Sequence, residues 1–565
     1  MNKRIPEAMQ VAELIANYIV SEGVSLAAGM SGQQIGPFLD QIASRDEIDL
    51  MYTRQERVAF DICDGFARAT GRPAVAFTDS GPAAANLMCG LVNSWGDSVP
   101  VLFIAGHNNA AEIASRQTKE IPFVDIFSPV SKWATVITHP SQTIGTLRRA
   151  FMHMYTGRQG PVVIGMPFDV AKMDVNVPSW VPISSQKRIR SGGDPSSIKS
   201  AIEMLISAKN PYVYVGAGIL FSEASDELVT LSELLTLPVA TTLNGKSAFP
   251  EEHPLSLGIG GFAQASYSSL PATKIANSAD LILTIGCGFK RHATQVLPRK
   301  EVPHIQIDVD PKELNREDVA ELAILGDSKV ILGQLIAEAE RQLSEKKIGS
   351  TDIRTSAVKG YKDEWAKICE PLLKSDEIPI NPFRVTDTLS NLLDKENSIL
   401  LHDAGTVRGT TSQHYMASKP RSFIGFGVES AMGWSLGAGM GAKKAHPKKL
   451  VVIVVGEEAF NETAMDVETS VRNSAPILII VKNNRKFIDT DGGESSRLAR
   501  VRFGTGVDIG SLCSALGAKT YEISDPSKLE DILKSAIETV SGGRTAVVEV
   551  KTQRVNASLH SLWQN

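Results

Sequence analysis

The sequence has little cysteine and no long apolar run, and both absences exclude whole classes of protein. Its 565 residues include five scattered cysteines, with no C-x-x-C pair among them: Cys63, Cys89, Cys287, Cys369 and Cys513. A disulfide framework or a zinc site is therefore not expected. No apolar run is long enough to cross a bilayer, so no membrane span is predicted. The N-terminus shows helical spacing of apolar residues rather than a signal peptide, and a cytoplasmic protein is expected.

The sequence also lacks an excess of either charge. Its 58 basic and 63 acidic residues give a net charge of -5, which gives no reason to expect nucleic acid or an anionic membrane as a partner. The composition is 43% hydrophobic and 21% charged, as in a soluble α/β protein. A chain of this length is expected to form about three or four domains.

Short apolar segments alternate with amphipathic helical segments, which predicts parallel sheets covered on both faces. Strands are expected at 73–78, 99–105, 160–166, 212–215, 281–285, 304–308, 398–401, 450–455, 477–481 and 545–550. These segments predict an α/β fold of three doubly wound domains, at residues 1–180, 190–345 and 375–555. A linker is expected at residues 184–195, and a solvated helix and connection at 338–362.

The sharpest constellation lies in the third block, where Glu457 follows a buried strand and Asn484 closes the next one. Side chains at these positions meet at the carboxyl edge of a parallel sheet, where α/β domains bind ligands. A carboxylate, an amide and a backbone carbonyl, here that of Lys486, are oxygen ligands that suit Mg²⁺. Acid turns and Asn-Asn pairs are also common at strand ends without a metal. The helical spacing of Ala464, Val467 and Val471 predicts one buried helix between the two strands.

In the first block, Glu56 stands just before an apolar helical run. A partly buried carboxylate has a raised pKa and can exchange a proton with a ring nitrogen. Alternatively, Glu56 is a helix N-terminal acid favoured by the helix dipole. The segment from Gly81 to Asn86 is expected to be a further turn that opens a helix, and close packing alone would explain it.

Taken together, these motifs resemble those of a known family. Residues 54–71 and 80–86 look like the pyrimidine-binding domain of thiamine-diphosphate enzymes of the acetolactate synthase type. The stretch from Gly456 to Asn484 is similar to the Gly-Asp-Gly…Asn-Asn motif that binds the diphosphate. Residues 427–442 look like the segment that supports the bent cofactor, and 243–256 and 279–288 resemble the middle domain. The resemblance covers nearly the whole chain in order.

This resemblance implies an enzyme that cleaves or forms a C–C bond on a small-molecule substrate, with thiamine diphosphate and Mg²⁺ as cofactors. Glu56 would be the catalytic residue, hydrogen-bonding the aminopyrimidine ring. The other implied site residues are Asn86, Thr406, Met432 and Glu458 for the cofactor, Glu457, Asn484 and Lys486 for the metal, and Gln34 and Lys119 for the substrate. The family's active sites lie at subunit interfaces, which implies a homodimer or homotetramer.

The middle domain of this family binds FAD, ADP or nothing. The glycine turns at Gly216–Gly218 and Gly286–Gly288 follow predicted strands, as nucleotide-binding turns do, but glycines after strands are usually simple turns. The sequence therefore does not support either nucleotide.

The chain departs from the family pattern at four side chains, and its loop at residues 81–86 lacks the second Gly that is usual there. Glu457 replaces Asp, Glu458 replaces Gly or a small residue, Lys119 stands where Gln is common, and Gln34 replaces the catalytic His of benzaldehyde lyase. The segment 458–469 is nearest to 2-hydroxyacyl-CoA lyases and oxalyl-CoA decarboxylases. Three hypotheses follow. The favoured one is a lyase or carboligase acting on a 2-hydroxy- or 2-keto-acyl compound. The others are an acetolactate-synthase-like transferase and a cofactor-free paralogue with a binding or structural role.

Overall fold

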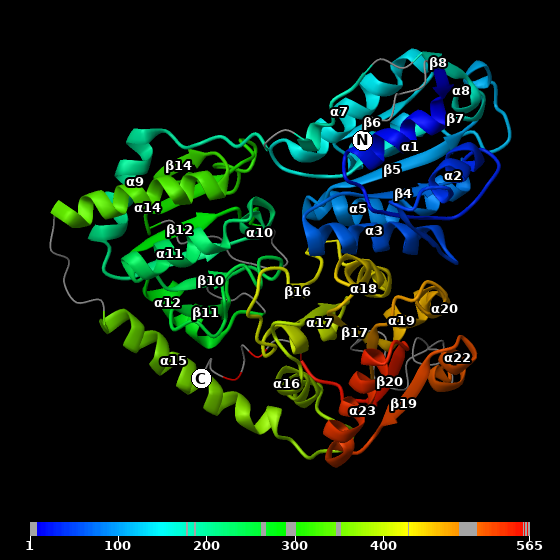
Figure 1. Ribbon diagram of the computed structural model, residues 1–565. Helices are drawn as coiled ribbons and strands as arrows, with labels where there is room; N and C mark the ends of the chain where they lie inside the picture. Colours follow the sequence, from blue (N-terminus) through cyan, green and yellow to red (C-terminus); the bar gives the residue numbers. More distant parts are fainter. Residues whose placement is uncertain are drawn as a thin grey trace. The chain divides into compact units, whose positions relative to one another are not determined.

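A computed structural model of the chain describes residues 8–176, 179–185, 188–261, 267–289, 301–345, 352–427, 429–484, 506–556, 559 and 562. These residues form three six-stranded parallel sheets and one antiparallel pair, β1 (Ala8–Gln10) with β8 (Asp174–Asn176). The chain divides into two compact units (Figure 1). The first unit comprises Met1–Ile189, Leu436–Pro447 and Met465–Ala475, and the second unit comprises Arg190–Ser435, Lys448–Ala464 and Pro476–Asn565.

The sheet of the first unit has the strand order β3-β2-β4-β5-β7-β6. Its strands are β2 (Leu26–Gly29), β3 (Asp49–Tyr52), β4 (Ala74–Thr78), β5 (Val101–His107), β6 (Trp133–Val136) and β7 (Val162–Pro167). Helices α1 (Val11–Ser21), α2 (Gly36–Ala43) and α7 (Thr143–Tyr155) cover one face, and α3 (Glu56–Thr70) and α5 (Met88–Asp97) cover the other. The four central strands are buried throughout, as apolar strands between two helix layers must be.

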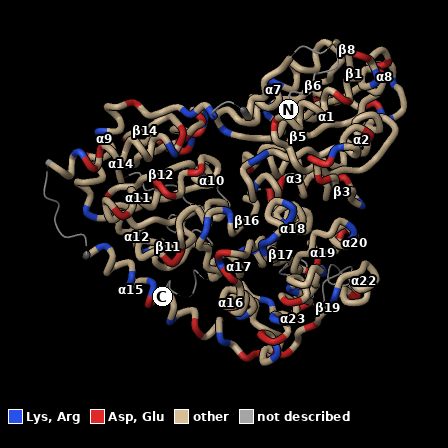
Figure 2. The backbone as a smooth tube through the Cα atoms, in the orientation of Figure 1, with Lys and Arg blue, Asp and Glu red and all other residues tan. Residues whose placement is uncertain are grey.

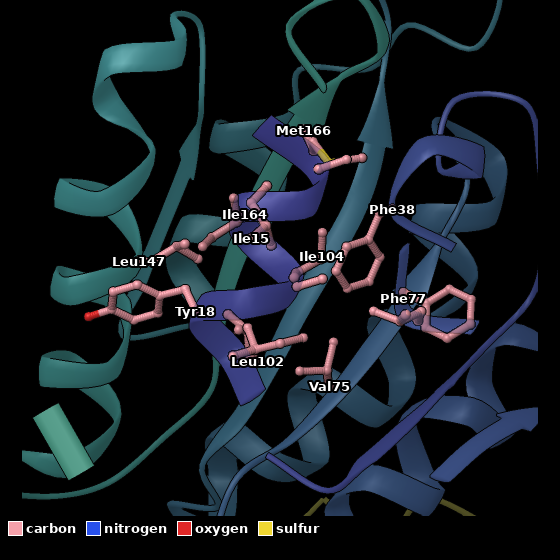
Figure 3. Packing of buried hydrophobic residues seen from close by; sticks show 14 of the residues in the cluster. Ile15, Tyr18, Phe38, Val75, Phe77, Leu102, Ile104, Leu147, Ile164 and Met166 are labelled. Atoms are coloured by element: carbon pink, nitrogen blue, oxygen red, sulfur yellow. The ribbon is translucent and has the colours of Figure 1, made fainter. Parts of the chain in front are cut away.

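Successive side chains of these strands point to opposite faces of the sheet, and those on the α1 side form a hydrophobic core with α1. Figure 3 shows residues two apart on the same strand, such as Val75 and Phe77, pointing to the same face. Ile15 and Tyr18 of α1 pack onto them, and all these side chains are buried. Each such apolar side chain stabilises the fold by about 1.5–3 kcal/mol.

The helix α18 (Trp434–Ala445) joins the first unit from Leu436 onward and approaches α3 closely. A Cβ on Gly441 would lie 1.9 Å from the Ile62 carbonyl oxygen, and one on Gly65 would lie 2.2 Å from the Ala438 oxygen. The backbones of the two helices are in close contact here, and only glycine, which has no side chain, leaves enough space for this contact. A separate ion pair at 2.8 Å, between Lys444 of α18 and Asp49 of β3, joins α18 to the edge of the sheet.

The segment after β17 corrects the prediction of one buried helix. The structure has α19 (Glu457–Thr463), a 3-10 turn at Ala464–Asp466 and then α20 (Val467–Arg472). The break falls where the chain passes from the second unit to the first. Asp466 fixes this break by accepting hydrogen bonds from Thr469 Oγ1, at 2.7 Å, and from the Arg54 N–H, at 2.8 Å. Beyond it, Val471 is 38% exposed, so the prediction was wrong for that residue.

In the second unit, one sheet has the order β11-β10-β9-β12-β13-β14. Its strands are β9 (Pro211–Val215), β10 (Val239–Thr241), β11 (Ser256–Ile259), β12 (Leu281–Ile285), β13 (His304–Asp308) and β14 (Leu322–Leu325). Helices α9 (Pro195–Ser207), α11 (Ser225–Leu235) and α14 (Ser328–Glu345) pack on one face, and α12 (Leu270–Ser278) and α15 (Asp352–Leu373) on the other. Counted along the chain, this order is 3-2-1-4-5-6, as in dinucleotide-binding domains.

The other sheet of the second unit has the order β16-β15-β17-β18-β20-β19. Its strands are β15 (Ser398–His402), β16 (Phe423–Ile424), β17 (Leu450–Gly456), β18 (Leu478–Asn483), β19 (Lys519–Ile523) and β20 (Ala546–Lys551). Helices α16 (Pro382–Leu392), α17 (Thr406–Ser412) and α23 (Leu529–Ser541) pack against it. Counted along the chain, its order is 2-1-3-4-6-5, the same as in the first unit.

The ten predicted strands all occur, each within two residues of its predicted ends, and the α/β class with three parallel sheets is confirmed. Figure 2 shows basic and acidic residues interspersed over both units, in keeping with the balanced charge of the sequence. None of the helices in the described ranges is long and apolar enough to span a membrane.

Candidate functional site

A cavity of about 790 Å³ opens at the carboxyl ends of β15, β17, β18 and β20 in the second unit. Thr406 lines it after β15, Glu457 and Glu458 after β17, Asn484 after β18, and the segment 552–556 after β20. β15 and β17 are neighbours at the point where the strand order of this sheet reverses. Doubly wound sheets bind ligands at this topological switch point.

Glu457 and Asn484, the two predicted metal ligands that the structure describes, both line this cavity. Gly456 lies opposite Lys482 in the parallel register of β17 and β18, so the residues that follow emerge at the same edge of the sheet. Glu457 is 9% exposed, Asn484 is half-buried, and both line the cavity. Lys486, the third predicted ligand, lies outside the described residues. The described ranges hold no cluster of three His, Cys, Asp or Glu side chains, but a Mg²⁺ site completed by phosphate oxygens does not need one.

Glu458 also lines the cavity, so the additional acidic residue belongs to the wall of this site. Its side chain is half-buried, and this burial, together with the charge of Glu462, raises its pKa. Two cations that the sequence reasoning missed, Lys482 and Arg554, line the same cavity. The cavity wall therefore carries charges of both signs.

Lys482 is 4% exposed and ties the end of β18 to two helices. Its ammonium donates to the Pro382 carbonyl at 2.9 Å, to Thr386 Oγ1 at 3.0 Å and to Thr410 Oγ1 at 3.3 Å. Burial lowers its pKa to about 7. A lysine inside the apolar run of β18 was the available sequence signal, because a buried lysine requires such partners.

Met432 lines the cavity on a loop that Asp403 holds in place. The buried Asp403 carboxylate accepts hydrogen bonds from the N–H groups of Ala404 at 2.7 Å, Gly433 at 3.0 Å and Ser435 at 2.8 Å. Burial raises its pKa, although these hydrogen bonds act in the opposite direction. Asp403 was not among the predicted site residues, and it joins the end of β15 to the segment that presents Met432.

Glu56 and Asn86 are brought together in the first unit, as expected for two residues of one site. Glu56 is the first residue of α3 and is half-buried. Asn86 ends the short helix α4 (Pro82–Asn86), and its Nδ2 donates to Glu56 Oε2 at 3.1 Å. The hydrogen bond from the Arg54 N–H to Asp466 fixes the chain just before Glu56.

Gln34 and Lys119 lie beside each other at the carboxyl ends of β2 and β5. Both contact Asp79, a residue that the sequence reasoning missed. The Gln34 N–H donates to Asp79 Oδ1 at 2.8 Å, and Lys119 Nζ donates to Asp79 Oδ2 at 2.7 Å. The two predicted substrate residues are therefore joined by one buried carboxylate.

Comparison with known proteins identifies the family. The chain matches the thiamine pyrophosphate enzyme N-terminal TPP binding domain over residues 9–127, the central domain over 198–335 and the C-terminal TPP binding domain over 403–550. It is 32% identical over 549 residues to the probable acetolactate synthase large subunit of Methanocaldococcus jannaschii, covering 94% of this chain and 90% of the relative. The chain belongs to the thiamine pyrophosphate enzymes of the acetolactate synthase type.

Other relatives carry the same description. The probable acetolactate synthase large subunit of Methanococcus aeolicus is 30% identical over 94% of this chain and 90% of its own. The acetolactate synthase isozyme 3 large subunit of Escherichia coli K12 is 28% identical over 96% and 95%. The family prediction is thus confirmed, and the chain is a thiamine-diphosphate-dependent enzyme.

Proposed function

We propose that the chain is a carboligase that joins two 2-keto acids, with loss of CO₂, into a 2-hydroxy-3-keto acid. The main structural support is the cavity at the switch point of the sheet that contains β15 and β17, whose wall includes both Glu457 and Asn484. The near full-length similarity to acetolactate synthase large subunits favours this transferase over a 2-hydroxyacyl-CoA lyase. The pairing of Glu56 with Asn86 argues against a cofactor-free paralogue.

The residues present fit thiamine diphosphate with Mg²⁺. Glu457 and Asn484 would hold the metal, with the carbonyl of Lys486 as the expected third protein ligand. Thr406 and Met432 line the same cavity, where Met432 offers an apolar surface to a ring and Thr406 a hydroxyl to a phosphate. When bound, thiamine diphosphate supplies a thiazolium ring that accepts the electron pair of the breaking C–C bond.

Glu56 would hold a proton at its carboxylate and exchange it with a ring nitrogen of the cofactor. Asn86 would orient that carboxylate through its 3.1 Å hydrogen bond to Oε2. Gln34 and Lys119 would contact the substrate. These roles are proposals that rest on the family and on the positions of the side chains.

The charge of Glu458 requires a counter-charge if a diphosphate is to bind nearby. Two like unit charges about 4 Å apart repel by about 4 kcal/mol at an effective dielectric of 20. Lys482 and Arg554 on the same cavity wall offset part of that repulsion. We propose that this balance lets the chain keep cofactor affinity despite two adjacent acids.

The homodimer or homotetramer, with active sites at subunit interfaces, also remains a proposal, and sedimentation velocity of the purified chain tests it. Whether a nucleotide binds at the sheet that contains β9 and β12 is a separate question. Gly216 and Gly286 lie at the switch point of that sheet, where a Cβ on Gly216 would lie 2.1 Å from the Gly286 oxygen. These glycines therefore serve close backbone packing. The absorbance spectrum of the purified protein reports whether a flavin is retained.

Titration calorimetry with thiamine diphosphate and Mg²⁺, followed by product analysis with pyruvate alone, tests the proposal. We expect cofactor binding and acetolactate formation. Absence of binding at millimolar cofactor would refute it. Cleavage of 2-hydroxyacyl-CoA without acetolactate formation would instead support the lyase hypothesis.

A further inference from the structure

Three loops of the first unit bring Gln34, Asp79 and Lys119 together at the switch point of its sheet. Gln34 follows β2, Asp79 directly follows β4, and Lys119 lies in the segment after β5. β2 and β4 are neighbouring strands where the order of this sheet reverses. Such a position forms a ligand-binding crevice in doubly wound domains.

Asp79 is the centre of the cluster and is only 5% exposed. Its carboxylate receives the Gln34 N–H at 2.8 Å and Lys119 Nζ at 2.7 Å. The Gln34 side-chain amide places its nitrogen 2.9 Å from both carboxylate oxygens, because an amide oxygen there would face only acceptors. Gly32 makes room for Asp79, since a Cβ on Gly32 would lie 2.1 Å from Asp79 Cγ. The site is therefore built around a carboxylate with satisfied hydrogen bonds.

Lys119 is held by Asp79, but its side chain remains 39% exposed. Its backbone has φ 67°, a left-handed conformation that is uncommon for lysine. Gly81 packs under this turn, because a Cβ on Gly81 would lie 2.5 Å from the Lys119 oxygen. An ammonium has three N–H donors, and the ion pair with Asp79 uses one of them. The exposed end of Lys119 can thus donate to a second acid.

We propose that Lys119 binds the carboxylate of a 2-keto acid substrate and that Asp79 is the positioning residue that aims its ammonium. This proposal rests on the proposed carboligase function and names the group that recognises its substrate class. An ammonium and a carboxylate form a charge-assisted hydrogen bond that is stronger than a neutral one.

Steady-state kinetics with pyruvate tests the role of Lys119. We expect Lys119→Gln to raise the KM for pyruvate about tenfold with little change in kcat, as for a lost charge-assisted hydrogen bond. Lys119→Arg should retain most of the affinity. Asp79→Asn keeps an acceptor for Gln34 but removes the ion pair, and it should raise KM severalfold. The matched control is Lys444→Gln, which removes an ion pair of similar length in the same unit and should leave KM unchanged. An unchanged KM in Lys119→Gln, or an equal rise in the control, would overturn the proposal.

The reaction joins a donor and an acceptor, and an aldehyde acceptor, which has no carboxylate, shows which of the two Lys119 binds. If Lys119 binds the donor, its replacement raises the KM for pyruvate with either acceptor. If Lys119 binds the acceptor, the effect occurs only when the acceptor is a keto acid. Either pattern supports the carboxylate site, whereas a KM effect on the aldehyde itself contradicts it.

A measurement that needs no turnover separates this proposal from the proposed function. Lys119 is labelled with an amine-acylating reagent and quantified by mass spectrometry, with and without thiamine diphosphate and Mg²⁺. Pyruvate should slow the labelling severalfold, and the neutral methyl pyruvate should not. Exposed Lys172 serves as the internal reference. Protection without acetolactate formation refutes only the proposed reaction, whereas equal effects of pyruvate and its ester, or none in either state, refute the carboxylate site.

Discussion

Replacing Gly441 by alanine should destabilise the first unit and disturb Glu56. Gly441 lies on α18, and the added Cβ would meet the Ile62 carbonyl oxygen of α3 at 1.9 Å and the Phe66 nitrogen at 2.7 Å. Real Cβ atoms essentially never approach a neighbour within 3.0 Å. The obstacles are backbone atoms, which cannot rotate away as a side chain can, so the two helices must move apart.

The magnitude follows from two opposing contributions to the free energy of unfolding. Overpacking a tight contact costs about 1–3 kcal/mol, and the upper end applies because both neighbours are backbone atoms. Alanine in a helix recovers about 1 kcal/mol relative to glycine. The net loss is about 2 kcal/mol, which lowers the melting temperature of a unit of this size by about 4–8 °C.

Scanning calorimetry of the full chain, with hydrogen exchange of α3 peptides, measures the effect on this multidomain protein. Exchange identifies the unit that loosens. The matched control is Gly145→Ala on α7, where nothing lies within 4 Å of the added Cβ and stability should hold or rise. Because α3 begins at Glu56, activity should fall in Gly441→Ala alone. Equal melting temperatures in the two variants, or unchanged α3 exchange, would refute the close packing of α3 and α18.

Three further predictions concern single charges. Glu56→Gln should lower kcat by about 100-fold or more while calorimetry still detects cofactor binding, and an undiminished rate would disprove its proton role. Glu458→Gln should strengthen thiamine diphosphate binding about fivefold at low salt, since we expect the basic side chains of the cavity to leave about 1 kcal/mol of the repulsion uncompensated; weaker binding would contradict repulsion. Burial lowers the pKa of His304 to about 4, so its stabilising effect is present above about pH 6.5 and is lost as the pH falls toward 4. His304→Gln should therefore lose about 2 kcal/mol less than the parent between pH 7 and pH 5, measured by urea unfolding, and parallel losses would contradict this.

The strands that the sequence predicted, such as β4 and β17, are buried along nearly their whole length and therefore read as apolar runs, whereas β2 and β10 are equally buried but have only four and three residues. By contrast, β3 has one buried residue among four and β19 one among five, so neither is a strand buried on both faces. The break at Ala464–Asp466 was unpredictable for another reason: helical spacing continues through it, and Asp466 acts through Arg54, 412 residues away in sequence.

The candidate site was predictable where one residue type at a strand or helix end carries the chemistry, as for Glu457, Asn484 and Glu56. It was not predictable where a residue acts through a partner from another segment. Asp79 is an ordinary loop acid until Lys119, 40 residues later, is placed against it. Asp403 likewise acquires its role only when Gly433 and Ser435 fold back onto it.

The adjacent acids Glu457 and Glu458 are better explained by charge balance than by loss of the cofactor. The cavity keeps basic side chains beside these acids: Lys482 is buried at the end of β18, where three hydrogen bonds hold its ammonium and burial lowers its pKa to about 7, so it is charged in part at neutral pH. Arg554 adds a second cation from the segment after β20. If Lys482 and Glu458 compensate each other, removing Lys482 leaves the Glu458 charge without a counter-charge. Lys482→Met should therefore weaken thiamine diphosphate binding more in the parent than in a Glu458→Gln background. A calorimetric double-mutant cycle measures this coupling, and additive effects would show that the two side chains act independently.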